Sequence, residues 1–284
     1  MSRTLLLRTA TGLLYVGAVV ACLLLHPLAY AALFALFSAL TLWEFCTLLN
    51  RQAGTQLNRL ITSAAGVYLF LATLAFNLGV ASAAVYTPYL ITLVYLLVSE
   101  LYLSNPTPVL NWAYSFMAQL YVALPFALLN ALAFTVHNGP GFMGVAYDWR
   151  LPLALFIFLW TSDTGAYLFG SKFGRHRLFP SISPKKSWEG SLAGACLALI
   201  ASQAIALAYT PTVSSCLFWA GFAAVVVLFG TWGDLVESLL KRKLGVKDSG
   251  SILPGHGGML DRFDSALLAI PAAIIYLQVL QTFA

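Results

Sequence analysis

Half of the acidic residues of this chain lie in one short stretch near its C-terminal end. The sequence has ten Asp and Glu residues in 284 positions, and five of them fall between positions 234 and 264, mixed with Lys and Arg. Carboxylates that gather in one place repel each other, and a bound divalent cation relieves that repulsion. The stretch therefore predicts a cation site with these candidate ligands: Asp234, Glu237, Asp248, Asp261 and Asp264.

The spacing of these residues indicates that two helix ends present them. Asp234, Glu237 and Lys241 stand at intervals of three and four, so they share one face if the apolar run before them continues as a helix. Asp261 and Asp264 are three apart, at the start of the last apolar run. Carboxylates at membrane depth are costly unless they are paired or bind a cation, so we expect both helix ends to converge on one site.

The segment between these helix ends, residues 250–258, is rich in glycine and contains His256. Glycine lets a backbone approach a ligand closely and direct its N–H groups at phosphate oxygens. Because basic residues and carboxylates flank the segment, we interpret it as a phosphate-binding loop rather than a flexible turn. His256 has two open roles, as a ligand of a phosphate oxygen or as a proton donor.

The rest of the chain is too apolar for a water-soluble domain. It is 60% hydrophobic and 9% charged, with a mean hydropathy of +0.85, whereas a soluble domain carries about 25% charged residues. A helix needs roughly 20 apolar residues to cross a bilayer. We therefore expect an all-α, polytopic integral membrane protein with about nine transmembrane helices, at roughly residues 9–25, 29–49, 60–77, 80–99, 109–134, 151–170, 190–209, 213–233 and 264–283.

These spans predict one integral membrane domain over residues 1–284 and a definite orientation. Residues 1–150 are expected to be mainly scaffold, and residues 151–284 to carry the catalytic loops. With nine spans, all of the fifteen Lys and Arg residues except Arg150 lie in connections on one side of the membrane. The positive-inside rule makes that side cytoplasmic, with the N-terminus inside and the C-terminus outside. Pro125 and Pro271 lie within spans and predict kinks there. Gly190 and Gly194 form a small-xxx-small pair, which predicts close helix packing rather than chemistry.

Several other classes of protein fit the sequence less well. The net charge of +5 arises in membrane-facing loops without a basic–aromatic motif, so we expect no nucleic-acid partner. Anionic headgroups or phosphorylated small molecules are the expected ligands. The four scattered cysteines predict packing roles rather than metal or disulfide roles. A transporter is disfavoured because the charges gather at one membrane face and no internal repeat is evident.

The polar stretch resembles the signature of the phosphatidate cytidylyltransferases, also called CDP-diacylglycerol synthases. Every fixed position of that signature is matched here by Ser238, Lys241-Arg242, Lys247-Asp248-Ser249-Gly250, Pro254-Gly255-His256-Gly257-Gly258 and Asp261-Arg262-Phe263-Asp264. A second segment is also similar to the family: Asp163-Thr164-Gly165-Ala166-Tyr167 and Ser183-Pro184-Lys185-Lys186-Ser187-Trp188-Glu189-Gly190. We expect this second segment to close on the C-terminal stretch from the preceding cytoplasmic loop.

The resemblance implies that CTP and phosphatidate are the substrates, and that pyrophosphate and CDP-diacylglycerol are the products. It implies Mg²⁺, with a second cation left open, and a bacterial cytoplasmic (inner) membrane with the active site facing the cytoplasm. Asp234 and Asp261 are the leading magnesium ligands, followed by Asp264, Glu237 and the less certain Asp248. The expected catalytic residues are Asp234, Asp261, His256, Lys241 and Asp264, and the expected substrate-binding residues are Ser183, Lys185, Lys186, Arg242, Lys247, Gly257, Gly258, Arg262 and Asp163.

Some alternatives stay open at this point. Asp163 fits two roles equally, as a ligand of the nucleotide base or sugar and as a polar residue that pairs helices. A CTP-dependent polyprenol or phytol kinase is the competing enzyme class, and its product would be CDP rather than pyrophosphate. Glu44 and Glu100 match nothing in the signature and are interpreted as structural. The oligomeric state is open, with a homodimer as one option, as are acyl-chain preference and the choice between CTP and dCTP.

Overall fold

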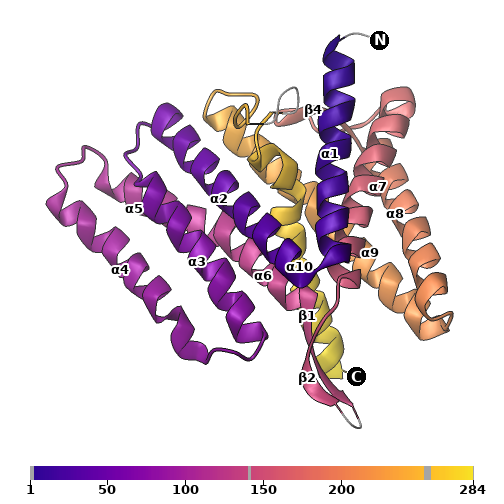
Figure 1. Cartoon of the computed structure of the whole chain (residues 1–284). Helices are drawn as coiled ribbons and strands as arrows, with labels where there is room; N and C mark the ends of the chain where they lie inside the picture. The colour runs from indigo at the N-terminus through magenta and orange to yellow at the C-terminus, as the bar shows by residue number, and fades with distance from the viewer. Residues whose placement is uncertain (1–2, 140–141, 253–256, 284) are drawn as a thin grey trace. The chain divides into compact units, whose positions relative to one another are not determined.

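The computed structural model describes residues 3–139, 142–252 and 257–283, and long apolar helices make up most of it (Figure 1). Helices are the expected solution in lipid, because a helix satisfies its backbone hydrogen bonds without water. Within the described residues, eight helical segments are long and apolar enough to cross a membrane: Pro27–Gln52, Arg59–Asn77, Ala83–Tyr102, Pro108–Ala133, Arg150–Phe173, Trp188–Tyr209, Val213–Lys243 and Leu260–Thr282. The expected all-α polytopic membrane fold is confirmed.

The first expected span, residues 9–25, lies within helix α1 (Arg3–Leu25), and its apolar segment Thr9–Leu25 is not among these eight segments. The count of nine spans therefore stays a prediction. The described chain divides into two compact units. The first unit comprises residues 1–149 and 244–263, and the second comprises residues 150–243 and 264–284.

In the first unit, helices lie side by side (Figure 1). Buried aromatic side chains form much of their core. Its elements are α1, α2 (Pro27–Gln52), α3 (Arg59–Asn77), η1 (Ala83–Tyr86), α4 (Thr87–Tyr102), α5 (Pro108–Met117), η2 (Ala118–Ala123) and α6 (Leu124–Ala133). Phe263, at the end of the segment 244–263, is fully buried there, with its ring 4.9 Å from that of Phe126. The signature stretch is therefore anchored to this core by an aromatic side chain.

A buried polar pair and a β-hairpin complete the first unit. The Tyr30 hydroxyl donates to Asn130 Oδ1 at 3.1 Å, and Asn130 Nδ2 donates to the Phe70 carbonyl at 2.9 Å. Buried polar groups need such partners, and this chain of hydrogen bonds ties α2, α3 and α6 together. Strands β1 (Phe134–Gly139) and β2 (Phe142–Tyr147) pair antiparallel, and the sequence analysis did not predict them.

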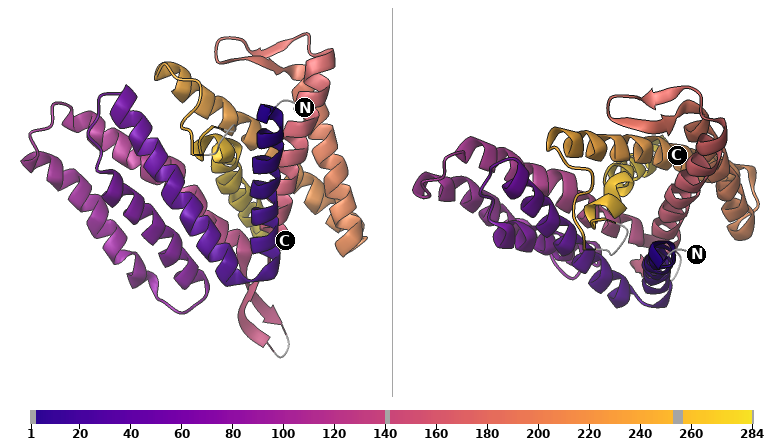
Figure 2. Two further views of the ribbon diagram at one scale, coloured as in Figure 1. Left: turned by 45° about the horizontal axis from the view of Figure 1, so that its top comes forward. Right: turned by 90° about the horizontal axis from the view of Figure 1, so that it is seen from above.

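In the second unit, four helices and a short hairpin carry the remaining polar residues. The helices are α7 (Arg150–Phe173), α8 (Trp188–Tyr209), α9 (Val213–Lys243) and the part of α10 (Leu260–Phe283) that starts at Asp264. Strands β3 (Arg177–Phe179) and β4 (Ser183–Ser187) pair antiparallel and lie at one end of α7 and α8 (Figure 2). The expected span 213–233 is only part of α9, because the helix continues for ten more residues, to Lys243.

Glycine lets α7 and α8 approach each other closely. A Cβ atom on Gly194 would collide with the carbonyl oxygen of Ser162, and one on Gly190 would lie 2.9 Å from the carbonyl oxygen of Ala166. These are backbone atoms, which cannot rotate away as a side chain can. The close packing that the Gly190–Gly194 spacing predicts is confirmed.

Replacing Gly194 by Ala should therefore destabilise the protein, because the added methyl group overpacks the α7–α8 contact by about 1–3 kcal/mol. The measurement is thermal unfolding in detergent, where the midpoint should fall. The matched control is Gly17→Ala in α1, where a Cβ atom meets nothing within 4 Å. Equal midpoints for the two variants would contradict the packing argument.

Candidate active site

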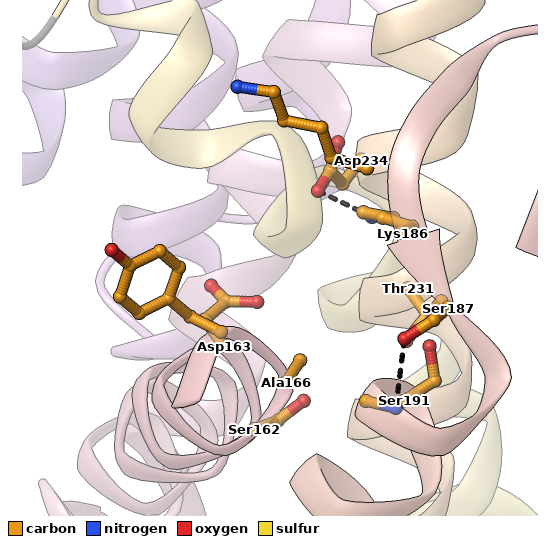
Figure 3. A pocket seen from close by; sticks show the side chains of 11 residues that line it. Ser162, Asp163, Ala166, Lys186, Ser187, Ser191, Thr231 and Asp234 are labelled. Carbon is orange, nitrogen blue, oxygen red and sulfur yellow. Dashed lines mark hydrogen bonds and ion pairs between the residues drawn. The ribbon is translucent and has the colours of Figure 1, made fainter. Parts of the chain in front are cut away.

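The clearest polar contact of the second unit joins β4 to α9. Lys186 Nζ lies 2.5 Å from Asp234 Oδ2, and both side chains keep 26% of their surface exposed (Figure 3). Lys186 follows the short turn between β3 and β4, and Asp234 lies on the polar continuation of α9. Two residues that the sequence analysis placed in different motifs are thus direct partners.

The extension of α9 places its polar residues on one face, as predicted. Asp234 Oδ1 accepts a hydrogen bond from the Ser238 hydroxyl at 3.1 Å, four residues further on. On the same helix, Glu237 and Lys241, which are also four residues apart, form an ion pair. Glu237 is completely buried, and a buried carboxylate is stable only with such a partner. The structure therefore shows Glu237 as the ion-pair partner of Lys241, while its role as a metal ligand stays a prediction.

A cavity of about 300 Å³ opens beside the Lys186–Asp234 pair. We call it the lysine cavity. Its lining comes from α7, β4, α8 and α9, and comprises Ser162, Asp163, Ala166, Tyr167, Lys185, Lys186, Ser187, Gly190, Ser191, Thr231 and Asp234. Asp163 and Ser162 lie across this space from Ser187 and Ser191 (Figure 3). Two ammonium groups, several hydroxyls and two carboxylates thus surround a space large enough for a phosphorylated group.

The N-terminus of α8 forms part of this wall. Ser187 is its N-cap, and the Ser187 hydroxyl oxygen accepts a hydrogen bond from the Gly190 N–H at 3.2 Å. The first N–H groups of a helix and its dipole favour a negative charge nearby. Together with Lys185 and Lys186, this helix end makes the β4 side of the lysine cavity suited to phosphate oxygens.

A third carboxylate of the second unit belongs to the same electrostatic cluster. Asp264 on α10 is repelled by Asp234 and, more weakly, by Asp163, and is attracted by Lys241. Gly233 permits this approach of α9 and α10, because a Cβ atom there would lie 3.1 Å from the Ser265 Cα atom. Carboxylates from three helices are therefore gathered in one region, as the charge pattern predicted for Asp234 and Asp264.

This cluster is compatible with magnesium, although it is not a complete cage. Among the described residues, no three His, Cys, Asp or Glu side chains form a ready-made metal-binding group. Mg²⁺ is usually held by one or two carboxylates, while water and substrate phosphates complete its octahedron. Asp234 and Asp264 are oxygen donors of the required kind, and their mutual repulsion favours a bound cation.

In the first unit, the segment before α10, residues 244–259, is called the signature loop, and its described residues on both sides of positions 253–256 contact Asp261. Asp261 Oδ2 accepts hydrogen bonds from the Gly258 N–H at 2.7 Å and from the Ser249 N–H at 3.1 Å. Gly257 has a φ of +83°, a conformation that favours glycine. Asp261, in the first turn of α10, therefore organises the loop that precedes this helix. Its role as a magnesium ligand, and its convergence with Asp234, stay predictions.

The same loop rests on Glu44, a residue of α2 that the sequence analysis interpreted as structural. The Glu44 carboxylate accepts hydrogen bonds from the Ser249 hydroxyl, from the Met259 N–H at 2.9 Å and from the Leu260 N–H at 3.1 Å. A Cβ atom on Gly258 would collide with this carboxylate, so glycine is required there. The structural interpretation is confirmed, and the part that Glu44 supports is the signature loop itself.

Glu189 has a similar role in the second unit, which the sequence analysis missed. Its carboxylate accepts hydrogen bonds from the Arg175 and His176 N–H groups, both at 3.1 Å, and lies 2.6 Å from His176 Nδ1. Glu189 thereby holds the start of the β3–β4 hairpin against α8. The available signal was its place directly after Ser187-Trp188, in the segment that resembles the family.

The remaining predicted residues lie at the margins of these two clusters. In the second unit, exposed Arg242 donates through Nε to the Ile182 carbonyl at 3.5 Å, and Ser183 begins β4 opposite Phe179. In the first unit, Lys247, Asp248 and Arg262 are exposed. His256, with Pro254 and Gly255, lies outside the described residues, so both of its possible roles stay predictions.

Comparisons with known proteins agree with the resemblance. A family model described as "Cytidylyltransferase family" matches residues 6–280. A phosphatidate cytidylyltransferase of Staphylococcus aureus (strain COL) is 42% identical over 176 residues, which cover 58% of this chain and 67% of that protein. Proteins of the same name from Staphylococcus saprophyticus and Staphylococcus haemolyticus are 39% and 37% identical, covering 57% and 66% of this chain and 68% of each relative.

Replacing Glu44 by Ala should destabilise the signature loop, because three hydrogen-bond donors lose their acceptor at a buried position. The expected loss is about 1–3 kcal/mol per donor left unsatisfied. Limited proteolysis within residues 244–259 is the measurement, since a released loop is cut faster. Glu100→Ala, at the end of α4, is the matched control. A loop that resists cleavage equally in both variants would contradict the role of Glu44.

Proposed function

Because the chain belongs to the cytidylyltransferase family, it is a nucleotidyltransferase, and we propose that it makes CDP-diacylglycerol and pyrophosphate from CTP and phosphatidate. The match of the family model over residues 6–280 carries this proposal. The curated phosphatidate cytidylyltransferases that share about two fifths of their aligned residues with the chain support the choice of substrates. The lysine cavity supports it chemically, because its ammonium groups suit phosphate oxygens.

The reaction needs little covalent help from the protein. A phosphate oxygen of phosphatidate forms a bond to the α-phosphorus of CTP, and the bond from that phosphorus to the oxygen bridging to the β-phosphate breaks. Pyrophosphate leaves with the electron pair. Both reactants are anions, so the main tasks are to neutralise charge and to align attack with departure.

The basic residues of the second unit perform these tasks in the proposed mechanism. Lys185 and Lys186 hold phosphate oxygens in the lysine cavity, next to the N-terminus of α8. Substrate phosphate competes with Asp234 for Lys186, and this exchange frees the Asp234 carboxylate for a cation. Lys241 and Arg242, which directly precede the last residue of α9, Lys243, supply further positive charge.

Asp234 and Asp261 remain the leading candidates for magnesium binding, with Asp264, Glu237 and Asp248 as further candidates. The repulsion between Asp234 and Asp264 supports a place for Asp264 among the ligands. Bound Mg²⁺ would neutralise the triphosphate and polarise the bond that breaks. A second cation is left open. From the signature, Ser183, Lys247, Gly257, Gly258 and Arg262 are the further substrate-binding candidates, His256 is a phosphate ligand or a proton donor, and Asp163 orients the nucleotide or pairs helices.

The proposed location is the bacterial cytoplasmic (inner) membrane, with the site on the cytoplasmic side. Eight apolar helical segments among the described residues and the bacterial relatives support a membrane protein. The distribution of Lys and Arg supports the orientation with the N-terminus inside and the C-terminus outside. The reaction involves no nucleic acid, and a homodimer is compatible with it.

Purified protein should release pyrophosphate from CTP only when phosphatidate and Mg²⁺ are both present. Chelation of the metal with EDTA should stop the reaction, and added Mg²⁺ should restore it. The measurement is pyrophosphate release together with detection of CDP-diacylglycerol. Formation of CDP with a phosphorylated lipid alcohol would instead identify a CTP-dependent lipid kinase.

Asp234→Asn should lower the rate by at least about 100-fold, as expected when one group that stabilises the transition state is lost. It should also raise the Mg²⁺ concentration needed for half-maximal rate. Asp148→Asn, in the connection before α7, is the control and should change neither value.

The variant Asp261→Asn, measured over the same range of Mg²⁺ concentrations, distinguishes metal binding by Asp261 from its role in the signature loop. A raised Mg²⁺ requirement would support metal binding by Asp261. An unchanged Mg²⁺ requirement with faster proteolysis of residues 244–259 would leave only its role in the loop, and full activity would remove the metal-ligand assignment.

A further inference from the structure

An apolar groove runs between α8 and α9 in the second unit. It encloses about 420 Å³, and every residue that lines it is apolar except Ser191 and Thr231. Ala223 and Val227 are buried in its floor, while exposed Leu192 and Leu228 form its sides. We call it the α8–α9 groove. A lipid-facing helix surface has no need of such a hollow, and here small side chains create it.

The α8–α9 groove is continuous with the lysine cavity. Ser191 and Thr231, the two polar residues of the groove, also line that cavity, together with Lys186 and Asp234. In Figure 3, both residues lie near Ser187, below the Lys186–Asp234 pair. The polar end of an apolar groove therefore opens onto a site suited to phosphate.

The dimensions and rim of the groove match a lipid chain. Its lining on α8 extends from Trp188 to Leu199, and eleven residues of helix span roughly 16 Å at a rise of 1.5 Å per residue. Trp188 and Trp232 are exposed at the end near the lysine cavity, and tryptophan is typical of the level of the lipid headgroups. A ligand that fills both spaces must have an anionic head and a long apolar chain.

We propose that the α8–α9 groove binds one acyl chain of phosphatidate while the phosphate of the same lipid lies in the lysine cavity. This inference rests on the proposed function and adds how the protein orients the lipid. The chain in the groove directs the phosphate toward Lys186. The small residues Ala195, Ala223 and Ala224 make the room for the chain and set which chains fit.

Ala224→Trp provides the test, because Ala224 is exposed, lines the groove and lies seven residues before Thr231, roughly 10 Å further from the lysine cavity. Pyrophosphate release is measured with dioleoyl phosphatidate and with dihexanoyl phosphatidate, whose chains are too short to reach Ala224. The rate with the long-chain lipid should fall on the order of tenfold or more, as when a pocket no longer accommodates its substrate. The rate with the short-chain lipid and the KM for CTP should stay near those of the unaltered protein.

Cys196→Trp is the matched control, because Cys196 is exposed on α8 but does not line the groove. It should leave both rates unchanged. If Ala224→Trp does not fold, Ala224→Leu and the enlarging variant Leu228→Ala replace it, and they should shift chain-length preference in opposite directions.

Equal losses with both lipids, or an equal effect of Cys196→Trp, would overturn the proposal and leave the groove as a surface covered by bulk lipid. Absence of pyrophosphate release by the unaltered protein with either lipid would be a different result. That result would contradict the proposed function itself.

Discussion

A carboxylate that is withdrawn from water must find a cation or hydrogen-bond donors, and this constraint shapes the polar half of the protein. The chain has only ten acidic residues, and the structure gives many of them a specific partner. Asp234 pairs with Lys186, Glu237 with Lys241, and Glu189 with the start of the β3–β4 hairpin. Glu44 and Asp261 accept hydrogen bonds from N–H groups of the signature loop. Each pairing also positions a segment that the proposed reaction uses.

Two of these ion pairs, Glu237–Lys241 and Lys186–Asp234, differ in whether an anionic substrate can reach them. The Glu237–Lys241 pair is internal to α9, and Glu237 is completely buried, so the pair stabilises the helix end as a unit. The Lys186–Asp234 pair is partly exposed at a cavity and joins separate elements. An anionic ligand can replace Asp234 at Lys186, because phosphate offers the ammonium group an equivalent partner. This difference explains why a salt bridge can lie within a binding site.

The arrangement of the second unit suits a reaction between a water-soluble nucleotide and a membrane lipid. Its polar cavity and its apolar groove share Ser191 and Thr231, so the boundary between water-like and lipid-like surroundings passes through these two residues. Close packing makes this geometry precise. Gly165 and Gly194 allow α7 and α8 to touch along their backbones, and Gly233 does the same for α9 against α10. The carboxylates on these helices are consequently held near one another by backbone contacts rather than by flexible loops.

Features that depend on neighbouring residues could be predicted from the sequence. The apolar runs predicted the helices, the intervals among Asp234, Glu237 and Lys241 predicted a shared face, and the Gly190–Gly194 spacing predicted close packing. These succeeded because helix geometry relates residues three or four positions apart in the same way everywhere. The strands of both hairpins were not predicted. β3 has only three residues, and β4, with the sequence Ser-Pro-Lys-Lys-Ser, lacks the alternation of apolar residues that marks a half-buried strand.

Partners far apart in the chain were decided only by the tertiary structure. No spacing rule joins Lys186 to Asp234, or Glu44 to a loop more than 200 residues away. Such pairs depend on which helices pack together, and apolar helix surfaces of similar composition do not specify that choice by pattern alone. The sequence by itself therefore determined the membrane fold, the chemical character of the polar stretch and the family. The tertiary structure decided which lysine meets Asp234, what supports the signature loop, and that an apolar groove opens beside the lysine cavity.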